Sequence, residues 1–140
     1  MCLNLRREEL LHLGVGTLLY DFKMLLYKFI EQNRNLDEYE REEMQQHTYL
    51  GFDEIRKIYG ISAQSAIIAL QHHERNNGSG YPRGLRKEDI TLLSKIVAVA
   101  DSYDALISHR PFRIAYTPVS YTHLRAHETS LHLVCRLLLE

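Results

Sequence analysis

The sequence predicts an all-α protein, because its apolar residues fall into four runs of helical character. These runs cover residues 7–19, 37–57, 62–74 and 90–107. An apolar fraction of 45% is enough for a packed core, and a length of 140 residues allows a single domain. The formal net charge of −1 leaves no general basic surface, so nucleic acid is not an expected partner.

The sequence lacks the usual features of membrane-spanning and secreted proteins. There is no uninterrupted run of about 18 apolar residues, so a membrane span is not expected. Glu8, Glu9 and His12 interrupt any apolar core of a signal peptide. Cys2 and Cys135 stand at the two ends and do not suggest a disulfide framework, which favours a reducing cytoplasm.

The first run predicts a mostly buried helix over residues 7–19, despite Gly14 and Gly16. Tyr20 and Asp21 end it. A carboxylate behind an apolar stretch is costly to bury unless it is paired or binds a metal. The residues alone leave two interpretations of Asp21 open: a buried ligand, or a cap or solvated helix end.

Residues 25–34 are ambiguous between a short helix and a loop. The second predicted helix opens at Asp37, with acids in its first turn that suit the helix dipole, and continues to about Lys57. It carries His47 on the same face as Met44 and Glu43. A lone histidine on such a face is usually a core residue.

The third predicted helix follows a stop at Tyr59-Gly60 and begins at a Ser62 cap. Its alanines allow close packing, and it delivers His72 and His73 at its end. The last helical region begins near residues 87–89. Its central I-V-A-V-A run is expected to be helix rather than strand because of its length and its alanines.

The residue types most typical of a functional site are grouped in residues 71–85, Q-H-H-E-R-N-N-G-S-G-Y-P-R-G-L. Neutral imidazole is a common ligand for transition metals, and arginine offers a planar fork for phosphate oxygens. Glycines let backbone N–H groups approach an anion closely. A His-His pair alone is more often structural, but the combination suits a metal site that faces a phosphate.

Two further carboxylates, Asp101 and Asp104, lie three residues apart on one face of the last helix. If both were buried, each would raise the pKa of the other. The sequence therefore indicates that a cation holds one of them, or that one caps or pairs with another element.

Four segments together resemble the signature of the HD-GYP family, the bacterial branch of the HD-domain metal-dependent phosphohydrolases. They are H-H-E-R at 72–75, G-S-G-Y-P-R-G-L at 78–85, V-A-V-A-D-S-Y-D-A-L at 97–106 and R-P-F-R at 110–113. The resemblance covers about residues 8–118. It implies an HD-type helical bundle and a metal-dependent phosphodiesterase that hydrolyses the bacterial second messenger cyclic di-GMP.

The resemblance also implies the roles of individual residues. The metal ligands would be Asp21, His47, His72, His73 and Asp101, with Asp21 central to catalysis. The first four would hold one metal in a mixed nitrogen and oxygen site that suits iron or manganese. The substrate-side loop would contain Gly80, Tyr81, Pro82 and Arg83. Asp104 would pair with Arg110 or Arg113.

Two departures from the family pattern bear on activity. Tyr20 stands where the family has a histidine ligand, and Met24 where it has a lysine. A neighbouring metal would then keep only Asp101 and a shared Asp21, so the second site is expected to be depleted. One alternative is therefore a degenerate domain that binds a nucleotide or a protein without turnover. Another is action on a different cyclic dinucleotide.

The ends of the chain also depart from the family. Residues 119–140 resemble a translated sequencing adapter, so we expect an HD-GYP domain over 1–118 and a non-native tail after it. No residue before Arg6 supplies the upstream ligand of the family. The sequence is thus interpreted as a domain truncated at both ends, normally joined to or working with a sensory or response-regulator domain.

Overall fold

The computed structural model describes residues 4–27 and 34–107, and this part of the chain contains helices and no strand. The elements in order are α1 (Arg7–Leu19), the 3-10 helix η1 (Phe22–Leu26), α2 (Glu38–Gln45), α3 (His47–Ile55), α4 (Ala63–Gln71), the 3-10 helix η3 (Lys87–Asp89) and α5 (Leu92–Ile107). The predicted all-α class is confirmed, and the I-V-A-V-A run is helical as expected.

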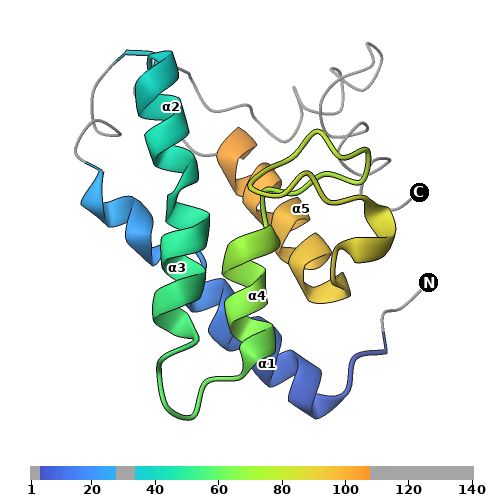
Figure 1. The fold of residues 1–140 in the computed structure, drawn as a ribbon. Coiled ribbons are helices and arrows are strands. Elements are labelled where there is room, and N and C mark those ends of the chain that lie inside the picture. Colours follow the sequence, from blue (N-terminus) through green and yellow to red (C-terminus); the bar gives the residue numbers. More distant parts are fainter. Residues whose placement is uncertain (1–3, 28–33, 108–140) are drawn as a thin grey trace.

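Helix α4 is central, because it packs against α1, α3 and α5 (Figure 1). Its Ala66 and Ala69 are fully buried against Ile55 of α3. Its Ile68 is buried against Leu93 and Val97 of α5. The small side chains let the helices approach closely, and the end of α4 therefore lies inside the bundle.

Helix α1 has the predicted bounds, but the expectation that it is mostly buried is wrong. Gly16 is its only buried residue, whereas Leu11 is 62% and Leu18 83% exposed. The reason is that α1 carries apolar side chains around its whole circumference while only part of that surface meets α4 and α5.

The single helix predicted over residues 37–57 is divided at Gln46 into α2 and α3. The Gln46 N–H bonds the carbonyl of Glu43, three residues back, at 3.0 Å. The side chains of His47 and Thr48 likewise bond carbonyls three residues back. Such local bonds compete with the regular helix pattern. The break makes His47 the first residue of α3.

Helix ends elsewhere follow the predicted chemistry. The Asp37 carboxylate accepts the Glu40 N–H at 2.8 Å and caps α2. The predicted Ser62 cap is confirmed, because its hydroxyl accepts the Gln64 N–H at 3.2 Å. The turn before it includes Gly60 at φ 84°, a left-handed conformation that suits glycine.

Within the described residues, no helix is both long enough and apolar enough to cross a membrane. The predicted tail over 119–140 lies outside the described residues, as do Arg110 and Arg113, the expected partners of Asp104. Asp104 itself is exposed, so it is not the buried carboxylate that the apolar pattern suggested.

Candidate metal centre

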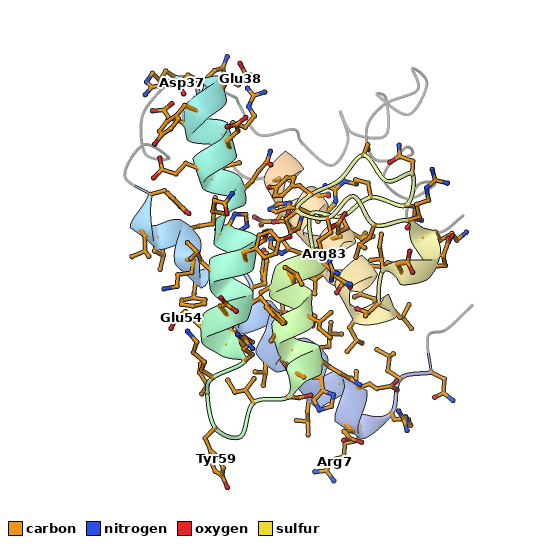
Figure 2. The ribbon with its side chains drawn as sticks, viewed as in Figure 1. Arg7, Asp37, Glu38, Glu54, Tyr59 and Arg83 are labelled. Atoms are coloured by element: carbon orange, nitrogen blue, oxygen red, sulfur yellow. The ribbon has the colours of Figure 1, made fainter. Side chains whose placement is uncertain are left out.

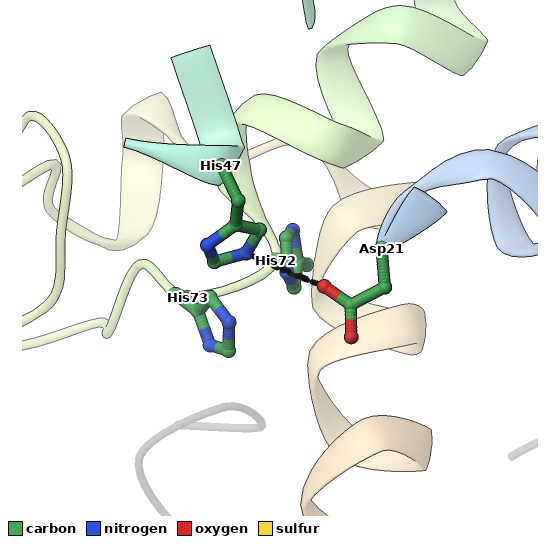
Figure 3. Close-up of side chains that lie close together, drawn as sticks. All are labelled: Asp21, His47, His72 and His73. Carbon is green, nitrogen blue, oxygen red and sulfur yellow. Dashed lines mark hydrogen bonds and ion pairs between the residues drawn. The ribbon is translucent and has the colours of Figure 1, made fainter. Parts of the chain in front are cut away.

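Four of the predicted ligands lie together in the structure: Asp21, His47, His72 and His73 (Figure 3). One ligand atom of each lies within 4.8 Å of one ligand atom of every other. Asp21 comes from the turn between α1 and η1, His47 from the start of α3, and the two adjacent histidines from the end of α4. The packing of α4 against α1 and α3 brings these segments together.

Three of the ligand atoms form a nearly equilateral triangle. His47 Nε2 lies 3.3 Å from His72 Nε2 and 3.3 Å from Asp21 Oδ1, and His72 Nε2 lies 3.5 Å from the same oxygen. Two atoms that are each about 2.1 Å from one ion, at angles between 90° and the tetrahedral value, lie roughly 3.0–3.4 Å apart. The spacing therefore fits three donors to a single metal ion.

The Nδ1 atoms of two of these histidines lie at hydrogen-bonding distance from backbone carbonyls. His47 Nδ1 lies at the carbonyl of Met44, and His72 Nδ1 lies 2.9 Å from the carbonyl of Ala69. In neutral rings the proton then belongs on Nδ1, which leaves the lone pair of each Nε2 directed at the cluster. Metal-bound histidines typically donate their other N–H in this way.

Asp21 is the acidic member of the centre, and its Oδ1 is buried without a hydrogen-bond partner. Burial would raise the pKa of Asp21, but the His47 and His72 imidazoles outweigh it and hold that pKa below its usual range. The residue precedes η1 without capping it by a side-chain hydrogen bond. A buried, ionised carboxylate oxygen within 3.5 Å of two imidazole nitrogens fits a cation-binding site.

His73 completes the group on the side of the following loop. Burial lowers the pKa of His73 well below its ordinary value, and the nearby His72 and His47 imidazoles lower it further. The ring is therefore neutral near pH 7, the form in which imidazole binds metals. Its centroid lies 4.6 Å from that of Tyr81, with 29° between the ring planes.

The predicted substrate loop lies directly beside the centre. The Tyr81 N–H donates to the carbonyl of His73 at 3.2 Å, and Tyr81-Pro82 is a cis peptide. Gly80 lies so close to the segment after α4 that an added Cβ would come within 2.4–2.5 Å of the backbone of residues 73–75. Arg83 is exposed in the region beyond the end of α4, away from the end of the molecule where Tyr59 and Arg7 lie (Figure 2).

The structure does not bring the fifth predicted ligand, Asp101, into this group. Asp101 lies on α5, and its Oδ1 accepts a hydrogen bond from the Tyr20 hydroxyl at 3.2 Å. Burial and the nearby Asp101 carboxylate raise the pKa of Tyr20, so the phenol stays protonated. A metal-ligand role for Asp101 therefore stays a prediction.

One residue next to the centre has no role in the sequence-based interpretation: Glu74, which follows the two histidines and is fully buried. Its carboxylate accepts the backbone N–H groups of Arg83 and Leu85. The signal in the sequence is an acid directly after two ligand candidates at a helix end. The partners of that acid lie nine and eleven residues away, which periodicity does not reveal.

Comparison with known proteins identifies the family of the chain. The HD domain family matches residues 3–128. The chain is 52% identical over 75 residues to a cyclic di-GMP phosphodiesterase of Thermotoga maritima, covering 53% of this chain and 20% of that protein. It is 38% identical over 118 residues to the cyclic di-GMP phosphodiesterase response regulator RpfG of Xanthomonas campestris, covering 82% of this chain and 31% of that protein.

Two further comparisons bear on substrate and fold. A 3'3'-cGAMP-specific phosphodiesterase of Vibrio cholerae is 35% identical over 115 residues, covering 79% of this chain and 23% of that protein. The solved structure of an HDG"Y"P protein from Bdellovibrio bacteriovorus superimposes with a TM-score of 0.67 at 21% identity, over 94% of this chain and 43% of that one. The chain thus spans less than a third of the length of these curated relatives.

Proposed function

The chain belongs to the HD-domain family and, by its signature, to the HD-GYP branch, and from this premise we propose that it is a metal-dependent phosphodiesterase domain that hydrolyses cyclic di-GMP. The observation that carries the proposal is the convergence of Asp21, His47, His72 and His73 beside the Tyr81–Arg83 loop. The names of several relatives give the substrate class.

The four converging residues would hold one ion, and their mixed nitrogen and oxygen donors favour iron or manganese. When bound, such an ion supplies positive charge that polarises a phosphate and activates water. The protein supplies the remaining parts. Tyr81 offers a ring face beside the centre for a base or ribose, and the exposed Arg83 guanidinium offers two parallel donors to a phosphate.

The test is metal content measured together with hydrolysis of cyclic di-GMP. The chain is loaded with Fe²⁺ or Mn²⁺ under anaerobic conditions, and product is followed by chromatography. We expect metal-dependent hydrolysis that a chelator abolishes and that His73→Gln abolishes together with metal binding. His12→Gln is the matched control, because His12 lies outside the four-residue group and its ring bonds the Gln64 side chain of α4. Hydrolysis that survives the chelator would refute the proposal.

A second candidate function is a degenerate domain that binds the nucleotide without turnover. The observation that favours it is the hydrogen bond from Tyr20 to Asp101, because it engages the carboxylate that a second ion would need. A displacement that relies on two ions would lose orders of magnitude in rate with one.

Substitution at Tyr20 separates the two candidates. Tyr20→His, with Met24→Lys, supplies a ligand and a cation, so we expect metal content to rise from about one ion per chain toward two, with faster hydrolysis. Tyr20→Phe is the control, since it removes the hydroxyl but adds no ligand, and its metal content should stay near one. Two ions and rapid hydrolysis in the unmodified chain would contradict the depleted second site.

The proposal also covers the choice of substrate and the partner domains. We place cyclic di-GMP ahead of 3'3'-cGAMP because most of the named relatives act on it, and parallel assays with both nucleotides decide between them. We also propose that the domain acts in the cytoplasm with a sensory or response-regulator domain, as the name of one relative suggests.

A further inference from the structure

Glu74 is a fully buried carboxylate, and no arginine or lysine among the described residues forms an ion pair with it. Burying an unpaired charge is costly unless hydrogen bonds satisfy it. The two residues before Glu74 are His72 and His73, both members of the candidate metal centre. The chain therefore keeps a carboxylate whose burial is energetically costly directly after two of its candidate metal ligands.

Both oxygens of this carboxylate bind backbone N–H groups of the following loop. Oε1 accepts the Arg83 N–H at 2.7 Å, and Oε2 accepts the Leu85 N–H at 2.8 Å. Both distances are at the short end of the range for N–H···O hydrogen bonds. One side chain at the end of α4 thus fixes two points of the loop.

The side chain one turn earlier shows why the residue type matters. Gln71 is also buried, and it holds the segment that follows the loop. Its amide nitrogen donates to the Asp89 carbonyl at 3.3 Å, and its oxygen accepts the Thr91 N–H at 3.0 Å. Where the backbone presents one carbonyl and one N–H the chain has an amide, and where it presents two N–H groups it has a carboxylate.

The same loop rests on the metal centre at its other side. Tyr81 bonds the His73 carbonyl through its backbone and stacks on the His73 ring. Gly80 lies against the backbone of residues 73–75 with no room for a side chain. The segment from Tyr81 to Leu85 is therefore held between the His73 contact and the Glu74 carboxylate.

We propose that Glu74 is a positioning residue for substrate binding: its carboxylate holds the backbone of Arg83 and Leu85 and so sets the Tyr81–Arg83 edge of the loop against the metal centre. It touches neither substrate nor metal. The inference rests on the proposed function for its substrate, cyclic di-GMP, whereas the tether itself rests on the geometry alone.

The test compares Glu74→Gln with the unmodified chain. Glutamine keeps the size but has one acceptor oxygen, so its NH₂ group must face one of the two N–H donors. Glu88→Gln is the matched control, because Glu88 is an exposed glutamate in the neighbouring η3. Nuclear magnetic resonance of the ¹⁵N-labelled, Zn²⁺-loaded chain follows the amide protons of Arg83 and Leu85, and hydrolysis of cyclic di-GMP by the Mn²⁺-loaded chain gives KM and kcat.

In the unmodified chain we expect both amide protons to be shifted downfield and to exchange slowly with solvent. Glu74→Gln should release at least one of them and raise KM about tenfold, the effect of losing one strong hydrogen bond, with kcat and metal content little changed. Glu88→Gln should change none of these quantities.

Three results would overturn the proposal. They are unchanged amide resonances in Glu74→Gln, an unchanged KM, or a loss of metal and fold, since the last would make Glu74 a core residue and nothing more. Absence of cyclic di-GMP binding and hydrolysis in the unmodified chain would refute the proposed function instead, while the two amide resonances would still decide whether the tether exists.

Discussion

At the scale of single residues, backbone contacts orient the side chains of the candidate centre. The Nδ1 atom of His47 lies at the Met44 carbonyl of α2 and that of His72 at the Ala69 carbonyl of α4, so both rings are held with Nε2 toward the centre. Asp21 Oδ1 is already buried and lacks a hydrogen-bond partner. Preorganisation of this kind lowers the ordering cost of binding.

Replacing Asp21 by asparagine tests this arrangement. The substitution keeps the shape but replaces an anionic ligand with a neutral amide, so we expect the affinity for Mn²⁺ to fall at least about 100-fold. A competition titration against a chelator measures the change. Asp53→Asn is the control, because Asp53 is an exposed aspartate paired with Arg56 at 2.8 Å, and it should bind Mn²⁺ as tightly as the unmodified chain. Equal affinity in Asp21→Asn would remove Asp21 from the ligand set.

At the scale of elements, the contact between α1 and α4 positions Asp21 relative to the histidines. Gly16 of α1 lies against Ile68 of α4, where an added Cβ would meet the Ile68 Cδ1 at 2.4 Å and its Cβ at 3.2 Å. Gly14, two residues earlier on the same helix, has nothing within 4 Å of an added Cβ. Substitutions at these two glycines therefore distinguish the effect of helix propensity from the effect of side-chain packing.

Alanine substitutions at Gly14 and at Gly16 should change the free energy of unfolding in opposite directions. Gly14→Ala should raise the free energy of unfolding by about 0.5–1 kcal/mol, because alanine favours a helix interior more than glycine does. Gly16→Ala gains the same term but crowds a fully buried isoleucine, which typically costs about 1–3 kcal/mol, so a net loss is expected. Denaturant unfolding measures both. A higher free energy of unfolding in both variants would show that the Ile68 side chain moves aside at little energetic cost.

The sequence predicts the helices well where apolar periodicity and capping residues agree, as at the Ser62 cap of α4. It does not predict the break at Gln46, because that break depends on bonds from the His47 and Thr48 side chains to backbone carbonyls three residues back. Convergence of the four ligands follows from the family signature. The contacts of Glu74 and Tyr20 join distant segments, and no local pattern encodes them.

At the scale of the whole molecule, the proposed domain boundary at residue 118 has a direct test. If residues 119–140 have no native role, deleting them should leave the affinity for Mn²⁺ within about twofold and the free energy of unfolding within about 0.5 kcal/mol, the range for changes away from structural contacts. Metal titration and denaturant unfolding of the shortened chain give the two numbers. A marked loss of stability would assign the segment to the domain.

Metal binding at the candidate centre would link the folding of the chain to metal concentration. Its ligands come from three segments: the turn after α1, the start of α3 and the end of α4. These segments are brought together only in the folded chain, so an ion that binds there stabilises the folded state over the unfolded one.

Thermal unfolding should therefore depend on Mn²⁺. At a free Mn²⁺ concentration 100 times the Kd, the stabilisation is about 2.7 kcal/mol, which raises Tm on the order of 10 °C for a domain of this size. A chelator should reverse the shift, and Asp21→Asn should remove most of it, whereas Asp53→Asn should keep it. If the unmodified chain gained no stability, or if Asp21→Asn gained as much, the ion would not be bound where these three segments meet.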